Sequence, residues 1–124
     1  MNTTYGLARV SSIGQTENTS LSFQSQRIKD YCRLHNLPLN KRIIEAESGA
    51  KSIEERSGLS KLQNLINEGT CRTIVVNKID RLGRSLLQGL LFLKYCEEHA
   101  TRVVSISENI DTDDPQSKLI INIL

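Results

Sequence analysis

The sequence predicts an α/β fold: an open, mainly parallel β-sheet with helices on both faces. Short apolar runs alternate with longer segments of helical periodicity, in the order β-α-β-α-β-α-β-α. The run "TIVVN" at 73–77 is rich in β-branched residues and lacks polar alternation, which is typical of a parallel strand covered on both faces. Polar residues follow the predicted strands directly, at the edge where such sheets meet their ligands.

The first part of the chain supplies a strand, a loop and a helix. Residues 7–10 form a short apolar strand, and a polar loop at 15–20 follows it. A helix begins near Leu21 and ends before Pro38, because a residue that precedes proline disfavours the helical conformation. The apolar residues of this helix that fall on one face are Leu21, Ile28, Tyr31 and Cys32.

A second strand and a second helix follow. "RIIEA" at 42–46 predicts the strand, and the glycines, serines and charges of 47–58 predict a loop. The next helix ends at Gly69, since glycine is the usual residue just past a helix end. Its apolar stripe consists of Leu59, Leu62, Leu65 and Ile66.

The remaining elements complete the alternation. After the strand at 73–77, the leucine-rich stretch 86–93 predicts a helix buried against the sheet, and 102–107 predicts the last strand. Asp114 and Pro115 are typical of an N-cap and a first helical position. We expect the apolar stripe of this final helix to pack on the sheet and then to extend to a partner protomer in a longer parent protein; it comprises Leu119, Ile120, Ile123 and Leu124.

Composition sets limits on function. The 124 residues form one domain, and a net charge of +2 neither demands nor excludes a nucleic-acid partner. Charge is unevenly distributed: the stretch 72–84 is basic and 108–114 is acidic. The three cysteines are widely spaced, which favours free thiols in a reducing cytosol over disulfides or a zinc site. The apolar runs are too short to span a membrane, so we expect a cytoplasmic protein without a membrane partner.

The side chains after the strands indicate phosphate chemistry. They are Arg9, Ser11, Ser12, Ser48, Arg56, Lys78, Asp80, Arg81 and Arg84. No histidine is among them, which argues against a serine–histidine–aspartate triad; His35 and His99 fall at helix ends. What remains is a hydroxyl among guanidinium groups, whose planar forks match phosphate oxygens. Taken singly, each arginine is better explained by a surface ion pair; their joint position at three strand ends favours function.

Four motifs resemble the catalytic domain of the serine recombinases, the resolvase/invertase family. They are "ARVSS", "SLSFQSQR", "ESGAKSIEERSGL" and "NKIDRLGRS", and the similarity continues in order to "IDTDDPQSKLIINIL". The gap between Ser11 and Gln24 is longer than in the small resolvases and is more similar to the large integrase and transposase branch. Leu7 stands where the family often has tyrosine.

The resemblance implies a role for each matching residue. Ser11 matches the nucleophile that cleaves and rejoins DNA through a 5′-phosphoserine link, without a metal or nucleotide cofactor. Asp80 is either a proton donor or acceptor for the leaving 3′-oxygen or a holder of the neighbouring arginines. The other matching catalytic residues are Arg9, Gln24, Ser48, Arg56, Arg81 and Arg84. The residues expected to bind DNA phosphate are Arg9, Lys78, Arg81 and Arg84.

The resemblance also implies partners beyond this chain. We expect residues 1–124 to be a catalytic domain that ends within its last long helix. Double-stranded DNA would be bound through a region outside this sequence, and the full-length parent would act as a homodimer or tetramer. We expect the protein to be associated with the nucleoid when it acts on DNA.

Two other functions fit part of the sequence. One is a non-catalytic DNA-associated or oligomerisation module of the same fold. The other is a metal-dependent nuclease or phosphatase that uses Asp111 and Asp113 with Glu45 or Glu47. The acidic turn is better explained as a helix cap, because Pro115 follows it directly.

Overall fold

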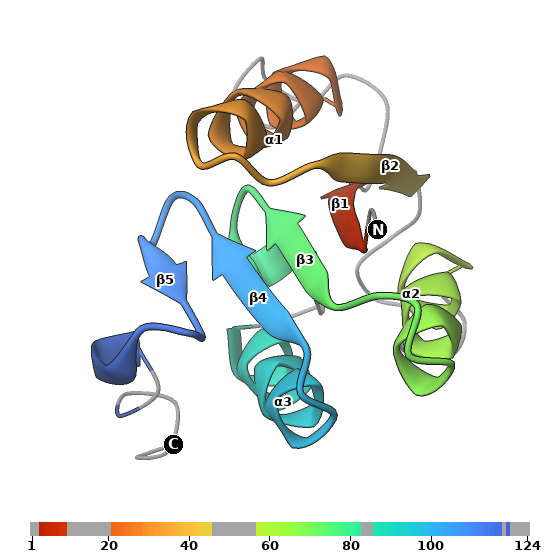
Figure 1. Cartoon of the computed structure of the whole chain (residues 1–124), viewed down its shortest axis with the longest axis vertical. Coiled ribbons are helices and arrows are strands. Elements are labelled where there is room, and N and C mark those ends of the chain that lie inside the picture. The colour runs from red at the N-terminus through yellow and green to blue at the C-terminus, as the bar shows by residue number, and fades with distance from the viewer. Residues whose placement is uncertain (1–2, 10–20, 46–56, 83–85, 118, 120–124) are drawn as a thin grey trace.

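The computed structural model describes residues 3–9, 21–45, 57–82, 86–117 and 119. Within these residues, five strands form a single sheet that is flanked by α-helices, as Figure 1 shows. The elements in chain order are β1 Thr4–Arg9, α1 Leu21–Leu34, β2 Leu39–Glu45, α2 Ser57–Asn67, β3 Thr73–Val76, the short 3-10 helix η3 Ile79–Arg81, α3 Leu86–Glu98, β4 Arg102–Ser105 and β5 Ile110–Asp111.

The strand order in the sheet is β2-β1-β3-β4-β5. Strands β1 to β4 are parallel, and β5 pairs antiparallel with β4. Leu7 of β1 aligns with Val76 of β3, and Val76 aligns with Ser105 of β4. The predicted fold class is confirmed, while β5 was not predicted, because a two-residue strand is too short to show alternation.

Helices cover both faces of the sheet, which is why the central strands are apolar throughout. Successive side chains of a strand point to opposite faces. Leu7 and Val76 pack in one cluster with residues of α2 and α3, whereas Val75 and Val104 pack on the other face against α1. Figure 1 shows α1 on one side of the sheet and α2 and α3 on the other.

Several boundaries differ from the prediction. Strands β1 and β2 begin three residues earlier than expected, because Thr4 already pairs with Leu39 and Thr73 in the ladder. Helix α2 begins at Ser57, so the last two residues of the predicted loop 47–58 are helical. Strand β4 ends at Ser105, and residues 106–109 form a turn to β5. Most of the predicted loops at 15–20 and 47–58 lies outside the described residues.

The predicted burial of the leucine-rich helix is wrong in part. Phe92 and Leu93 of α3 are buried in the core, but Leu87 is 65% exposed and Leu91 is 56% exposed. One face of a helix is enough to cover a sheet, and α3 carries apolar residues beyond that face.

The start of the final helix is confirmed at its cap. The Asp114 carboxylate accepts the N–H of Gln116 at 3.2 Å, and residues 115–117 are helical. Leu119 is 64% exposed, so its predicted packing on the sheet is wrong. The rest of the predicted stripe, at 120–124, lies outside the described residues.

Two further predictions concern free cysteines and a membrane span. All three cysteines are buried and free, and burial raises the pKa of the Cys71 thiol to about 12. None of the helices in the described ranges combines the length and apolar character that crossing a bilayer requires.

Candidate active site at the carboxyl edge of the sheet

Two buried arginines lie at the carboxyl edge of neighbouring strands. Arg9 is the last residue of β1, and Arg81 ends η3, the short helix that follows β3. Each is 6% exposed, and the Nε atoms of both are buried. Strands β1 and β3 are adjacent and parallel, and η3 contacts β1. The fold thus brings two guanidinium groups to one edge, beside the point where the chain leaves β1 for Ser11.

Gln24 of α1 fixes the backbone of Arg9. Its Oε1 accepts the Arg9 N–H at 3.0 Å, and its Nε2 donates to the Arg9 carbonyl oxygen at 2.9 Å. The ladder between β1 and β3 ends at Leu7. The Gln24 carboxamide therefore bonds the β1 backbone two residues beyond the end of that ladder. Gln24 itself is fully buried. The sequence placed Gln24 in the site, and the structure gives it a positioning contact with Arg9.

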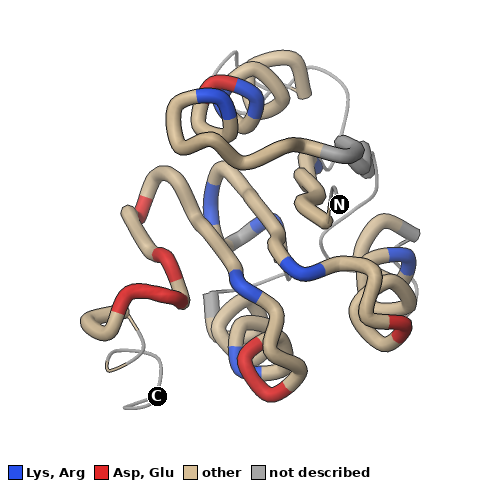
Figure 2. Tube along the Cα trace, in the orientation of Figure 1, with Lys and Arg blue, Asp and Glu red and all other residues tan. Residues whose placement is uncertain are grey.

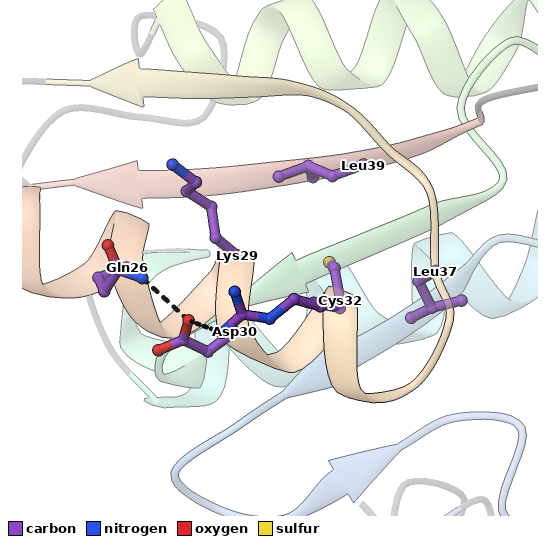
Figure 3. Close-up of a pocket in the computed structure, with 7 residues that line it drawn as sticks. Gln26, Lys29, Asp30, Cys32, Leu37 and Leu39 are labelled. Atoms are coloured by element: carbon purple, nitrogen blue, oxygen red, sulfur yellow. Dashed lines mark hydrogen bonds and ion pairs between the residues drawn. The ribbon is translucent and has the colours of Figure 1, made fainter.

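Replacing Gln24 with leucine should therefore destabilise the fold. The change keeps the approximate volume but leaves two buried backbone groups of Arg9 without these bonds, and each group left unsatisfied costs about 1–3 kcal/mol of unfolding free energy. Urea unfolding of the 124-residue chain measures the loss. Gln26→Leu is the matched control, because Gln26 lies on the same helix and its side chain bonds the exposed Asp30 (Figure 3). Equal losses of unfolding free energy for Gln24→Leu and Gln26→Leu would contradict a stabilising role of the contact between Gln24 and Arg9.

The segment after β3 forms a tight turn that presents Arg81. Lys78 is extended, with φ −143° and ψ 152°, and its carbonyl oxygen accepts the N–H of Arg81 at 3.1 Å. The Leu82 N–H donates to the Ile79 carbonyl oxygen at 2.8 Å. Lys78 is exposed, whereas Arg81 is buried. Of the two cations in this segment, Lys78 is therefore accessible to solvent, whereas Arg81 lies in the interior of the site.

The other predicted site residues are not placed by the structure. Asp80 has its backbone in η3, and its side chain lies outside what the structure describes. The remaining candidates lie outside the described residues, and they are Ser11, Ser12, Ser48, Arg56 and Arg84. Their roles stay predictions.

Sequence reasoning missed Glu108. The Ile79 N–H, at the start of η3, donates to its Oε2 at 3.2 Å. The two residues are 29 positions apart, and no local pattern marks such a contact. A carboxylate in a turn is usually solvated, so the sequence alone offers no signal for it.

The acidic segment that contains Asp111 and Asp113 forms an ion pair with Arg102. Arg102 donates to both carboxylate oxygens of Asp111, from Nε at 3.0 Å and from a terminal nitrogen at 2.7 Å. The hydrogen bond from Arg102 lowers the pKa of the Asp111 carboxyl below its usual value. Asp113 lies 3.6 Å from the same guanidinium. Figure 2 shows acidic residues gathered along this segment.

This geometry argues against a nuclease site shared by Asp111 and Glu45. Glu45 ends β2 and Asp111 ends β5, which are the two edge strands of the sheet. Neighbouring strands lie roughly 4.8 Å apart, and β2 and β5 are four strand spacings apart, so about 19 Å separates Glu45 from Asp111. Glu47, the other partner considered, lies outside the described residues. The alternative with Glu45 is therefore wrong on distance.

A surface pocket of about 430 Å³ lies elsewhere on the molecule. It sits between the second half of α1 and the start of β2, close to the amino end of that strand and away from Arg9 (Figure 3). Asp30 accepts hydrogen bonds from Gln26 at 2.9 Å and from Arg33 at 3.1 Å, so part of the polar rim is internally bonded. This pocket is separate from the candidate active site.

Comparison with known proteins identifies the family. Residues 4–124 match the family described as "Resolvase, N terminal domain". The chain belongs to the resolvase/invertase family of serine recombinases. The Tn3 transposon resolvase of Escherichia coli is 30% identical over 120 residues, which cover 97% of this chain and 58% of that protein. The DNA-invertase of Escherichia phage P1 is 31% identical over 82 residues, which cover 66% of this chain and 42% of that protein.

Solved structures agree with a resolvase-family catalytic domain. The N-terminal catalytic domain of TP901-1 integrase has a TM-score of 0.86 and 29% identity, and the match covers 97% of this chain and 89% of that one. The C-terminal catalytic domain of ISC1926 TnpA, an IS607-like serine recombinase, shares the fold with a TM-score of 0.72 at 21% identity over 83% and 66% of the two chains. The integrase similarity agrees with the branch that the long Ser11–Gln24 gap indicates.

Proposed function

We propose that this resolvase-family domain catalyses DNA strand cleavage and rejoining through Ser11. The observation that carries the proposal is the pair of buried guanidiniums, Arg9 and Arg81, at the carboxyl ends of adjacent parallel strands. Ser11 follows Arg9, the last residue of β1, by two residues in the sequence. Fixed positive charge beside a hydroxyl suits attack on a phosphodiester, whose transition state is more negative than its ground state.

The reaction is a transfer of the phosphoryl group between oxygens. The Ser11 oxygen bonds to the phosphorus, the bond from phosphorus to the 3′-oxygen breaks, and the 3′-oxygen takes up a proton as it leaves. The serine hydroxyl gives up its proton, so charge and protons balance. Rejoining reverses these steps when a 3′-hydroxyl attacks the 5′-phosphoserine. Asp80 is a candidate for the proton at the leaving oxygen, and its alternative role is to hold Arg81 or Arg84.

The remaining polar residues fit a DNA-facing site. Lys78 is exposed at the same edge and is suited to a neighbouring DNA phosphate. Arg56, Arg84 and Ser48 complete the set that the family motifs supply. Double-stranded DNA is the proposed substrate, and a homodimer or tetramer is the proposed assembly of the natural protein that carries this chain.

Cleavage should proceed without a divalent metal. The arginines supply the positive charge that a metal ion gives in many nucleases, so the rate should be unchanged in EDTA. The measurement is recombination and covalent protein–DNA adduct formation by the natural protein that carries this chain, with EDTA or with Mg²⁺. Activity that EDTA abolishes and Mg²⁺ restores would count against the serine mechanism.

A further inference from the structure

The start of η3 is bound by a carboxylate from a distant turn. The first N–H groups of any helix lack partners inside it. Glu108 accepts the N–H of Ile79 at 3.2 Å through Oε2, and its Oε1 accepts a hydrogen bond from the hydroxyl of Ser105. Hydrogen bonds to a charged acceptor are stronger than those between neutral groups. Two donors thus fix the orientation of the Glu108 carboxylate.

The turn that carries Glu108 is itself held on β3. Residues 106–109 connect β4 to β5. The Ile106 N–H donates to the Val76 carbonyl oxygen at 3.0 Å, and the Ser107 N–H donates to the Asn77 carbonyl oxygen at 2.9 Å. Arg27 of α1 also donates to the Ser107 hydroxyl at 3.1 Å. Glu108 therefore extends from a turn anchored to the core of the sheet.

Helix α3 holds η3 from another direction. Gly89 packs so closely on Ile79 that a Cβ there would lie 2.7 Å from the Ile79 carbonyl oxygen and 2.5 Å from its Cγ2. Ile79 and Leu82 are fully buried around this contact. The backbone of Ile79 is thus bonded at its N–H by Glu108 and packed near its carbonyl by Gly89. Arg81 follows two residues later, so its position depends on these contacts.

We propose that Glu108 is a positioning residue for the recombination reaction, because its carboxylate fixes the backbone that aims Arg81. This inference rests on the proposed function. The carboxylate contacts Ile79 and Ser105 and acts on the reaction only through Arg81. Loss of the tether lets η3 shift, and a small misplacement of a catalytic group costs up to about 100-fold in rate.

The test compares adduct formation in variants of the natural protein that carries this chain. At saturating DNA, Glu108→Ala should slow formation of the covalent adduct by about 10- to 100-fold while the DNA dissociation constant stays the same. Glu108→Gln can still accept the Ile79 N–H through its amide oxygen and can donate from its amide nitrogen to the Ser105 hydroxyl oxygen, but it loses the negative charge that strengthens the first bond, so its rate should lie between. Glu98→Ala is the matched control: it removes the same charge at the exposed end of α3 and should leave the rate unchanged.

A second comparison separates positioning from general stability. In an Arg81→Ala background, adding Glu108→Ala should slow the reaction no further, because the residue it positions is gone. If Glu108→Ala fails to fold, Glu108→Gln serves in both backgrounds. An unchanged rate in the single variants, or full additivity with Arg81→Ala, overturns this inference alone. No adduct from the unaltered protein overturns the proposed function, and this inference with it.

Discussion

Ser11→Ala should abolish covalent protein–DNA adducts, whereas Ser12→Ala should retain them. Strand alternation predicts from the sequence that Ser11 shares the face of Arg9 and that Ser12 does not, and both serines lie outside the described residues. The alanine variant keeps the arginines and DNA contacts but has no oxygen to form the phosphoserine bond. Loss of the nucleophile therefore removes the intermediate itself, which is a larger effect than any loss of a stabilising charge.

The assay uses the natural protein that carries this chain and DNA labelled on the 3′ side of the cleavage site, in the fragment whose 5′-phosphate becomes linked to the serine. Denaturing electrophoresis then separates free DNA from DNA linked to protein. A shifted band that persists in Ser11→Ala but disappears in Ser12→Ala would reverse the assignment. No shifted band from the unaltered protein, with DNA binding intact, would favour the alternative of a non-catalytic DNA-associated module.

The sheet could be predicted because its signals are local. The run at 73–77 is apolar along both faces, and the structure shows β3 buried in full between α1 and the helices of the opposite face. The position of Arg9 and Arg81 at one edge followed from the same argument, since parallel strands end together. These predictions needed only periodicity and the rule for ligand position in open sheets.

Long-range contacts were beyond the sequence. Glu108 and Ile79 are 29 residues apart and meet only because the turn after β4 folds over the end of β3. The exposure of Leu87 and Leu91 also depends on which face of α3 meets the sheet, and the leucines of α3 extend beyond one face, so they do not reveal it. Strand β5 is held by pairing with β4 and by the Arg102–Asp111 ion pair, and neither is a local signal.

Arg81→Ala should lower the rate of adduct formation by about 100- to 1,000-fold, the usual loss when one fixed donor to a developing charge is removed. Arg81 is buried at the carboxyl edge, so its charge acts where water screens it poorly. Arg81→Lys keeps the charge but loses the planar fork, and it should recover only part of the rate. The rate is measured at saturating DNA, so weaker binding does not enter.

The matched control is Arg72→Ala, because Arg72 is exposed and precedes β3 at the opposite end from Arg81. Its Nε–H donates to the Gly69 carbonyl oxygen at 3.4 Å, far from the proposed site along the strand. Thermal unfolding of each variant shows whether a lost rate reflects a lost fold; Arg81→Lys keeps most of the side-chain volume and serves if the alanine variant does not fold. A rate that falls equally for Arg72→Ala would mean that general attraction to DNA explains the effect. A rate that is unchanged in a folded Arg81→Ala would remove this guanidinium from the mechanism and leave Arg9 as the buried cation among the described residues of this edge.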